Sequence, residues 1–84
     1  MNELRTALRS ELVSQLGVKG VLTDETGLFS GGLLDSLSVM DLVGFVEGKI
    51  GRAIPPAEIT LANFDSIDSI VRYSRTLVSN GASA

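Results

Sequence analysis

A serine beside an acid is the most chemically distinctive feature of the sequence. Ser36 follows Asp35 within residues 32–37, Gly-Leu-Leu-Asp-Ser-Leu, where a glycine-rich stretch gives way to a helical pattern, so its hydroxyl should be exposed. A serine hydrolase is disfavoured, because the chain has no histidine to accept the hydroxyl proton and no Gly-x-Ser-x-Gly turn surrounds Ser36. A plain helix N-cap explains the Asp-Ser pair equally well.

The position of Ser36 also suits the covalent attachment of a phosphate group. A helix N-terminus offers free backbone N–H groups and the positive end of the helix dipole, and both favour negative charge. Asp35 can help to hold the metal ion that accompanies a phosphoryl donor. Residues 65–67 and 68–70, both Asp-Ser-Ile, imitate the motif but fall in the last predicted helix, where we expect cap or surface roles.

Composition excludes several kinds of function. The 84 residues include no cysteine and no histidine, so disulfides, thiolate or imidazole metal sites and triad catalysis are absent, and we expect no enzyme. The net charge of −3 and the few aromatic residues argue against binding nucleic acid. The longest uncharged stretch, residues 26–34, is far shorter than the roughly 20 residues of a membrane span. The charged N-terminus has no signal-peptide core, so we expect a cytoplasmic protein without membrane attachment.

The elements that must position Ser36 begin with a helix and a loop. Leucines at every fourth position predict a first helix over residues 3–16, with Asn2 as its N-cap and Gly17 as its end: Leu4, Leu8, Leu12 and Leu16. Five of the nine glycines fall in residues 17–35, which predicts a long loop. Apolar side chains in this loop are expected to rest on the core: Val18, Val21, Leu22, Leu28, Phe29, Leu33 and Leu34.

The second predicted helix runs from Asp35, its N-cap, to Gly51. Its apolar positions are spaced as on one helical face: Val39, Leu42, Val43, Val46 and Ile50. Gly44 and Gly48 interrupt the helix, each at up to about 1 kcal/mol relative to alanine. They are either tolerated defects or points where another helix, a partner or a ligand approaches bare backbone.

The rest of the chain completes a small bundle. Pro56 suits the first turn of a short helix that reaches Ile59, and residues 63–66 read as a turn and cap before a last helix that ends near Val78. The predicted fold is therefore all-α, with three main helices, one short helix and a long first loop. Residues 1–78 should form one domain, and we expect residues 79–84 to be a frayed tail.

Acidic residues concentrate in the middle of the chain. Residues 22–71 contain two basic and eight acidic residues, whereas the segments before and after them are net basic. This acidity is either an ordinary solvated surface or a surface that steers basic partners.

The chain resembles the acyl and peptidyl carrier proteins over nearly its whole length. The resemblance rests on length, acidity, helix order, the long first loop, and an Asp-Ser-Leu motif that precedes the Pro-Pro pair at 55–56 and the cap cluster at 63–67. In that family the motif serine carries 4′-phosphopantetheine. The resemblance therefore implies that Ser36, preceded by Asp35 and followed by Leu37, is the single attachment site.

By the same resemblance, the thiol of this group, which comes from coenzyme A, holds acyl or aminoacyl cargo as a thioester and carries it between enzymes. The implied partners are a phosphopantetheinyl transferase, a loading acyltransferase or adenylating ligase, and a downstream synthase or transferase. Family docking positions correspond to Leu37, Met40, Asp41 and Glu47. The alternatives without a docking function are that Leu37 and Met40 are ordinary core residues, and that Asp41 and Glu47 are ordinary solvated surface residues.

In this family the cargo can rest between the second and third helices. If Gly44 and Gly48 mark a close approach, they would widen a cleft lined by Leu37, Met40, Ile59 and Leu61. The predicted width of the cargo cleft therefore depends on whether Gly44 and Gly48 mark a close approach.

Departures from the fatty acid carriers point to a specialised pathway. Ser38 stands where those carriers commonly have an acid, and Leu34 precedes the motif in place of a small or polar residue. The Leu-Leu-Asp-Ser-Leu run is more like free-standing carriers of polyketide, nonribosomal or aminoacyl antibiotic biosynthesis. We expect a discrete, monomeric protein from its start at Met1 and its end soon after the last helix. The alternative is a small helical interaction domain in which Ser36 is only a cap.

Overall fold

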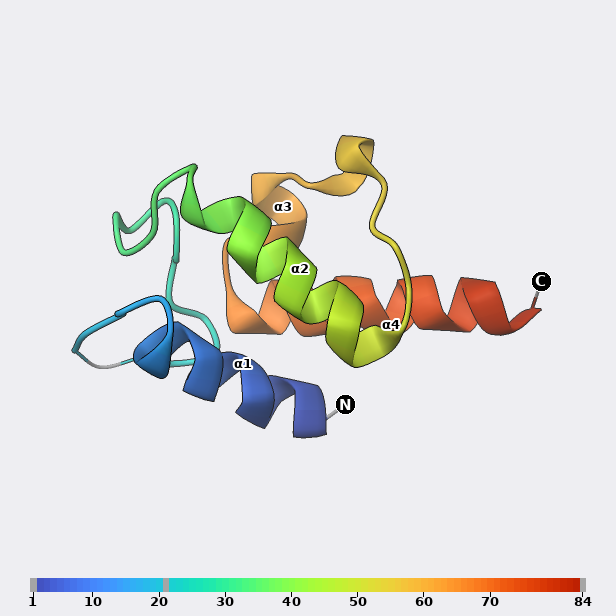
Figure 1. The fold of residues 1–84 in the computed structure, drawn as a ribbon, viewed down its shortest axis with the longest axis horizontal. Coiled ribbons are helices and arrows are strands. Elements are labelled where there is room, and N and C mark those ends of the chain that lie inside the picture. Colours follow the sequence, from blue (N-terminus) through green and yellow to red (C-terminus); the bar gives the residue numbers. More distant parts are fainter. Residues whose placement is uncertain (1, 21, 84) are drawn as a thin grey trace.

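The computed structural model describes residues 2–20 and 22–83. Within these ranges the chain is all-helical, which confirms the predicted fold class (Figure 1). The expected position of Val21 in the core falls outside the described residues. The elements, in chain order, are α1 (Asn2–Ser14), α2 (Ser38–Ile50), the 3-10 helix η1 (Pro56–Glu58), α3 (Leu61–Phe64) and α4 (Ile67–Ser83).

Helix α1 forms because its leucines bury one stripe. Leu4, Leu8 and Leu12 lie in the core, whereas the intervening positions are exposed or half-buried. The helix already includes Asn2, and Met1, which would be the cap, lies outside the described residues. Past the last turn, Gly17 adopts a left-handed φ of 72°, and the Val18 N–H donates to the Leu12 carbonyl at 2.9 Å. The predicted stop at this glycine is confirmed.

Helix α2 buries the face that the sequence predicted. Leu42, Val43 and Val46 are in the core, and Val39 and Ile50 are half-buried. Gly51 ends the helix with a φ of 69° while its N–H donates to the Glu47 carbonyl at 2.9 Å. The start differs from the prediction, since regular helix begins at Ser38 and not at Asp35.

The second half of the chain is more helical than expected. Pro56 begins η1 as predicted, but the short helix α3 at residues 61–64 was not predicted, and it includes residues 63 and 64 of the expected turn. The Thr60 side chain caps α3 by accepting from the Asn63 N–H at 3.3 Å. Helix α4 continues through Ser83, beyond the predicted end at Val78.

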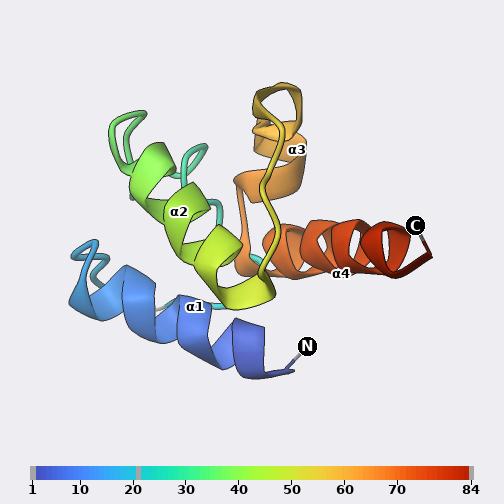
Figure 2. The ribbon, with the colours of Figure 1, turned by 45° about the vertical axis from the view of Figure 1, so that its right-hand side comes forward.

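Helices α1, α2 and α4 pack against one another, and α3 packs on α4. In Figure 2, α1 and α2 lie side by side while the C-terminal part of α4 extends past both. The long loop lies at one end of the bundle, and its Val18, Leu28 and Leu34 side chains are buried in the common core. The prediction that the loop rests on the core is therefore confirmed for these residues, whereas Leu33 stays exposed.

Ion pairs fasten the loop to two helices. The Arg5 guanidinium on α1 reaches Asp24 at 2.7 Å and Asp68 on α4 at 3.1 Å, and these hydrogen bonds, the one to Asp68 first, raise the pKa of Arg5. Arg9 also pairs with Asp24 and donates to the Leu22 carbonyl. No helix in the described part of the chain combines the length and the apolarity needed to cross a membrane.

Candidate functional site

Ser36 lies in a tight turn just before α2. Asp35 organises this turn, because its Oδ1 accepts from the N–H groups of Leu37 at 3.1 Å and Ser38 at 3.0 Å and from the Ser38 hydroxyl at 3.2 Å. The Ser36 side chain is exposed, and its hydroxyl takes part in none of these bonds. The turn thus presents a free hydroxyl on a rigid support.

Asp35 has the hydrogen bonds of the predicted N-cap, because its carboxylate accepts from the N–H groups two and three residues further on; regular helix is formed from Ser38. The Asp35 carboxylate also accepts from two of the backbone N–H groups that were predicted to favour a phosphate. Its second oxygen, Oδ2, is used by none of the turn's hydrogen bonds. Among the described residues, no group of three or more acidic side chains is arranged to hold a metal by itself.

An apolar groove of about 380 Å³ opens beside Ser36. The loop and the start of α2 form one side, and α3 with the two residues before it forms the other. Its lining contains no ionisable side chain, so it favours an uncharged, apolar group. The lining residues are Phe29, Leu34, Ser36, Val39, Ile59, Thr60, Leu61 and Phe64.

The two α2 glycines do not shape this groove. A Cβ built on Gly44 or Gly48 would meet no other heavy atom within 4 Å, and both residues are exposed. Leu37 and Met40, which were expected to line the cleft, are also absent from its lining. No other helix of the described chain approaches these glycines, so that form of the close-approach interpretation is wrong; both lie on the solvent side of α2.

The candidate docking residues divide into two groups. Leu37 is 83% exposed and Met40 is 63% exposed, which excludes the alternative that they are core residues. Asp41 is exposed on the same helix. Glu47 instead is half-buried, and its Oε2 accepts from the Ile54 N–H at 2.7 Å, which fastens the segment after α2.

Leu61 is a further exposed apolar residue near Ser36, although the sequence predicted it only as part of the cleft lining. It is 61% exposed on α3, while it also lines the groove next to Ser36. Its exposure leaves no signal in the sequence, because a helix of four residues is too short to show a periodic pattern.

The loop that leads into Ser36 is anchored by Asp65, which the sequence analysis saw only as part of a cap cluster. Its Oδ1 accepts from the N–H groups of Phe29 at 2.8 Å and Ser30 at 2.9 Å, and its Oδ2 accepts from the Ser30 hydroxyl at 2.6 Å. These bonds, those from Ser30 first, lower the pKa of Asp65.

The two imitations of the motif have structural roles. Ser66 Oγ accepts from the Ser69 N–H at 3.1 Å and lies 3.0 Å from the Ser69 hydroxyl at the start of α4. Both side chains are half-buried. The expected cap role of this pair is confirmed, and Ser36 differs from them by its exposed, uncommitted hydroxyl.

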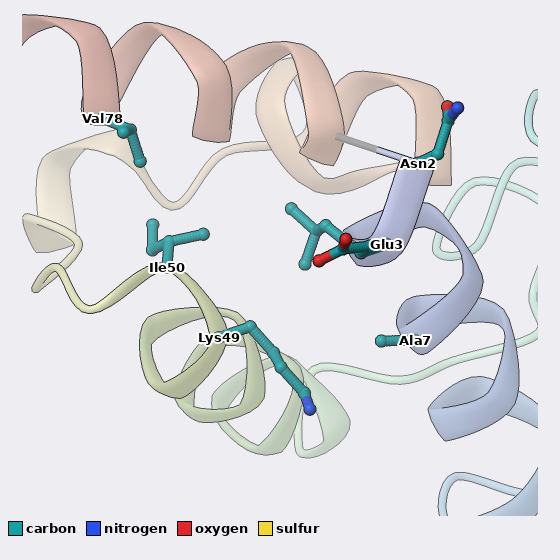
Figure 3. Close-up of a pocket in the computed structure, with 7 residues that line it drawn as sticks. Asn2, Glu3, Ala7, Lys49, Ile50 and Val78 are labelled. Atoms are coloured by element: carbon teal, nitrogen blue, oxygen red, sulfur yellow. The ribbon is translucent and has the colours of Figure 1, made fainter.

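A second cavity, of about 610 Å³, lies at the far end of α2 from Ser36. Figure 3 shows Asn2, Glu3 and Ala7 from α1 facing Lys49 and Ile50 from the end of α2, with Val78 of α4 closing the third side. None of the candidate attachment or docking residues lines it.

Two comparisons with known proteins bear on this site. A family model described as "Phosphopantetheine attachment site" matches residues 6–74, a range that includes the Ser36 turn and the groove. "Lincomycin biosynthesis protein LmbN" of Streptomyces lincolnensis is 39% identical over 66 residues, which cover 79% of this chain and 23% of that protein. The chain thus matches less than a quarter of the length of this curated relative.

Proposed function

The chain belongs to the phosphopantetheine attachment site family, whose members carry covalently attached 4′-phosphopantetheine, and on that premise we propose that Ser36 bears the group and presents its cargo to successive enzymes. The observation that carries the proposal is the exposed Ser36 hydroxyl, uncommitted within the turn that Asp35 closes. The protein is a phosphopantetheine carrier, and it works with partner enzymes of biosynthesis.

The attachment step needs little from the chain itself. The Ser36 oxygen forms a bond to the phosphorus that carries the pantetheine arm, the pyrophosphate P–O bond of coenzyme A breaks, and the nucleotide half leaves. The hydroxyl proton passes to a base of the transferase, since the carrier has no histidine. Asp35 Oδ2 is free to share the metal ion that neutralises the pyrophosphate.

The attached group supplies the thiol that a cysteine-free chain lacks, and acyl or aminoacyl cargo is held there as a thioester. The groove beside Ser36 is an apolar site next to the attachment point, and its lining favours the uncharged part of such a cargo. In this proposal the carrier holds the cargo, and the partner enzymes carry out the reactions.

The proposed setting is specialised metabolism in the cytoplasm, of the polyketide or nonribosomal type. The name of the similar Streptomyces lincolnensis protein refers to lincomycin biosynthesis, and this supports an antibiotic-type pathway for the present chain. The Leu-Leu-Asp-Ser-Leu run at residues 33–37 supports the same assignment through its likeness to free-standing carriers. We propose that the carrier acts as a monomer.

The proposed partners are a phosphopantetheinyl transferase, a loading acyltransferase or adenylating ligase, and a downstream synthase or transferase. Leu37 and Met40 offer them exposed apolar side chains next to Ser36, with Asp41 beside these on α2. Glu47 is the weakest of the proposed docking residues, because one of its oxygens is already engaged within the chain.

Intact-mass measurement tests the attachment site. The purified protein is incubated with a phosphopantetheinyl transferase and coenzyme A, and wild type should gain the mass of one phosphopantetheine group. Ser36→Ala should gain none, whereas the matched control Ser69→Ala should gain the group like wild type. An unmodified wild type favours the alternative function, a helical interaction domain, and modification of Ser36→Ala moves the site elsewhere.

A further inference from the structure

The segment that leads into Ser36 is fastened to the rest of the molecule at one residue. Among the described residues, the hydrogen bonds from residues 27–34 to another segment of the chain all end on Asp65. Besides the three bonds to its carboxylate, the Asp65 carbonyl accepts from the Leu28 N–H at 2.6 Å. The Asp35 bonds, in contrast, remain within the turn itself.

The segment between Asp65 and Ser36 is compact enough to transmit this anchoring. The Gly31 N–H donates to the Gly27 carbonyl at 3.1 Å, and the Leu34 N–H donates to the Leu28 carbonyl at 2.8 Å. A Cβ on Gly31 would overlap the Gly27 carbonyl oxygen, so the two backbones are in direct contact. Because Leu34 is followed directly by Asp35 and Ser36, a shift of the anchored end moves the serine.

Asp65 also sets the spacing of the groove. It follows Phe64, which lines the groove from the α3 side, and it binds the N–H of Phe29, which lines the groove from the loop side. One carboxylate therefore joins both walls between which Ser36 opens.

We propose that Asp65 is a positioning residue for Ser36, holding the loop so that the serine hydroxyl reaches the phosphoryl donor in a reactive orientation; this inference rests on the proposed attachment at Ser36. Loss of the Asp65 carboxylate should affect binding of the transferase less than it affects the rate of the transfer step. Helix α2, which carries Met40 and Asp41, is held by its own buried residues Leu42, Val43 and Val46. Loss of the carboxylate should therefore lower kcat for phosphopantetheine transfer with little change in KM, because misplacing a reacting group costs rate.

The test compares Asp65→Asn with Asp68→Asn in the full chain. Asp68 lies at the start of α4, three residues after Asp65, and also loses a charge on substitution, but its carboxylate pairs with Arg5 and Arg72 and makes no bond to residues 27–37. Transfer from coenzyme A by one phosphopantetheinyl transferase is followed by intact mass over a range of carrier concentrations. Each variant is measured at a temperature at which circular dichroism shows it to be folded.

For Asp65→Asn we expect kcat to fall about tenfold while KM stays within about twofold of wild type. Asp68→Asn should keep both parameters within about twofold. Amide hydrogen exchange should accelerate at Phe29 and Ser30 in Asp65→Asn but stay slow at Val43 and Val46. Equal kcat values for the two variants, or a raised KM with unchanged kcat, overturn the positioning role.

Ser30→Ala provides a milder second test, since it removes only one bond to the carboxylate from an exposed side chain. Ser30→Ala should also lower kcat, but by a smaller factor than Asp65→Asn. If Asp65→Asn does not fold, the result for Ser30→Ala alone tests the positioning role. A kcat equal to wild type in Ser30→Ala then overturns the inference. If the proposed attachment at Ser36 is itself wrong, the result differs from these kinetic outcomes: wild type stays unmodified, or Ser36→Ala is still modified.

Discussion

Ser74 on α4 is fully buried, and its hydroxyl has no hydrogen-bond partner among the described residues. A buried hydroxyl without a partner loses its bonds to water and gains nothing in return. Ser74→Ala should therefore raise the free energy of unfolding by about 1 kcal/mol. Urea unfolding followed by circular dichroism measures this change, and a less stable Ser74→Ala would mean that the hydroxyl has a partner in solution.

Two glycines give opposite predictions for the same substitution. Gly44→Ala places a methyl group into open space on an exposed helix face, and should raise the free energy of unfolding by up to about 1 kcal/mol through helix propensity. Gly31→Ala drives a methyl group into the Gly27 carbonyl and should lower it by about 1–3 kcal/mol. Urea titrations of both variants, with Gly48→Ala as the control for Gly44, compare them directly. Equal effects at Gly31 and Gly44 would contradict the contact at Gly31.

At the residue scale, the exposure of Ser36 directly before α2 was predictable, because its neighbours Asp35 and Leu37 and the following helix are local features. The roles of Asp65 and Glu47 were not predictable in the same way. Asp65 acts on residues more than thirty positions earlier in the chain, and Glu47 accepts from a backbone N–H beyond the end of its helix. Such contacts depend on how the elements come together, which no local pattern records.

At the scale of elements, the tie between η1 and α4 is sensitive to alkaline pH. The Tyr73 hydroxyl donates to the Glu58 carboxylate, and burial, followed by this bond, raises the pKa of Tyr73 to about 12. A tyrosine in the unfolded chain ionises near pH 10. The contribution to stability is thus complete below about pH 10 and is lost as pH rises toward 12, where the folded protein must also ionise.

Tyr73 is the only tyrosine, so phenolate absorbance reports on this group alone. The absorbance of the folded protein should rise well above pH 10, and only on unfolding should it titrate normally. Across the same range, the free energy of unfolding should fall more steeply for wild type than for Tyr73→Phe. An ordinary titration in the folded protein would show that the hydroxyl is not held by Glu58.

The long elements and the proline-initiated η1 were predictable, whereas α3 was not. Stripes of three or more buried residues indicated α1 and α2 from the sequence, whereas α3 has four residues and buries only Phe64. The Asp35 carboxylate caps the N–H groups of Leu37 and Ser38, and regular helix begins at Ser38. A pattern of apolar residues does not fix the first helical residue to within one or two positions.

At the scale of the whole molecule, much of the acidity of the middle segment is used internally. Asp24 and Asp68 pair with arginines, Asp65 and Glu47 bind backbone N–H groups, and Glu58 accepts from Tyr73. Asp35 serves its own turn, and the acids that remain free of such roles in the described structure are few. Most acidic residues of the middle segment therefore also have a structural role within the fold.

This use of charge predicts how partners recognise the carrier. Exposed charge pairs contribute about 0.2–1 kcal/mol and are screened by salt, whereas burying an apolar side chain contributes about 1.5–3 kcal/mol. Met40→Ala should therefore reduce kcat/KM for phosphopantetheine transfer by about tenfold, and Asp41→Asn by less than about fivefold. Val13→Ala, which truncates a side chain 53% exposed on α1, is the matched control and should leave the rate unchanged. The transferase is the probe because every carrier of the family must meet one. A larger effect of Asp41→Asn than of Met40→Ala, with a steep loss of rate at high salt, would show that charge dominates docking after all.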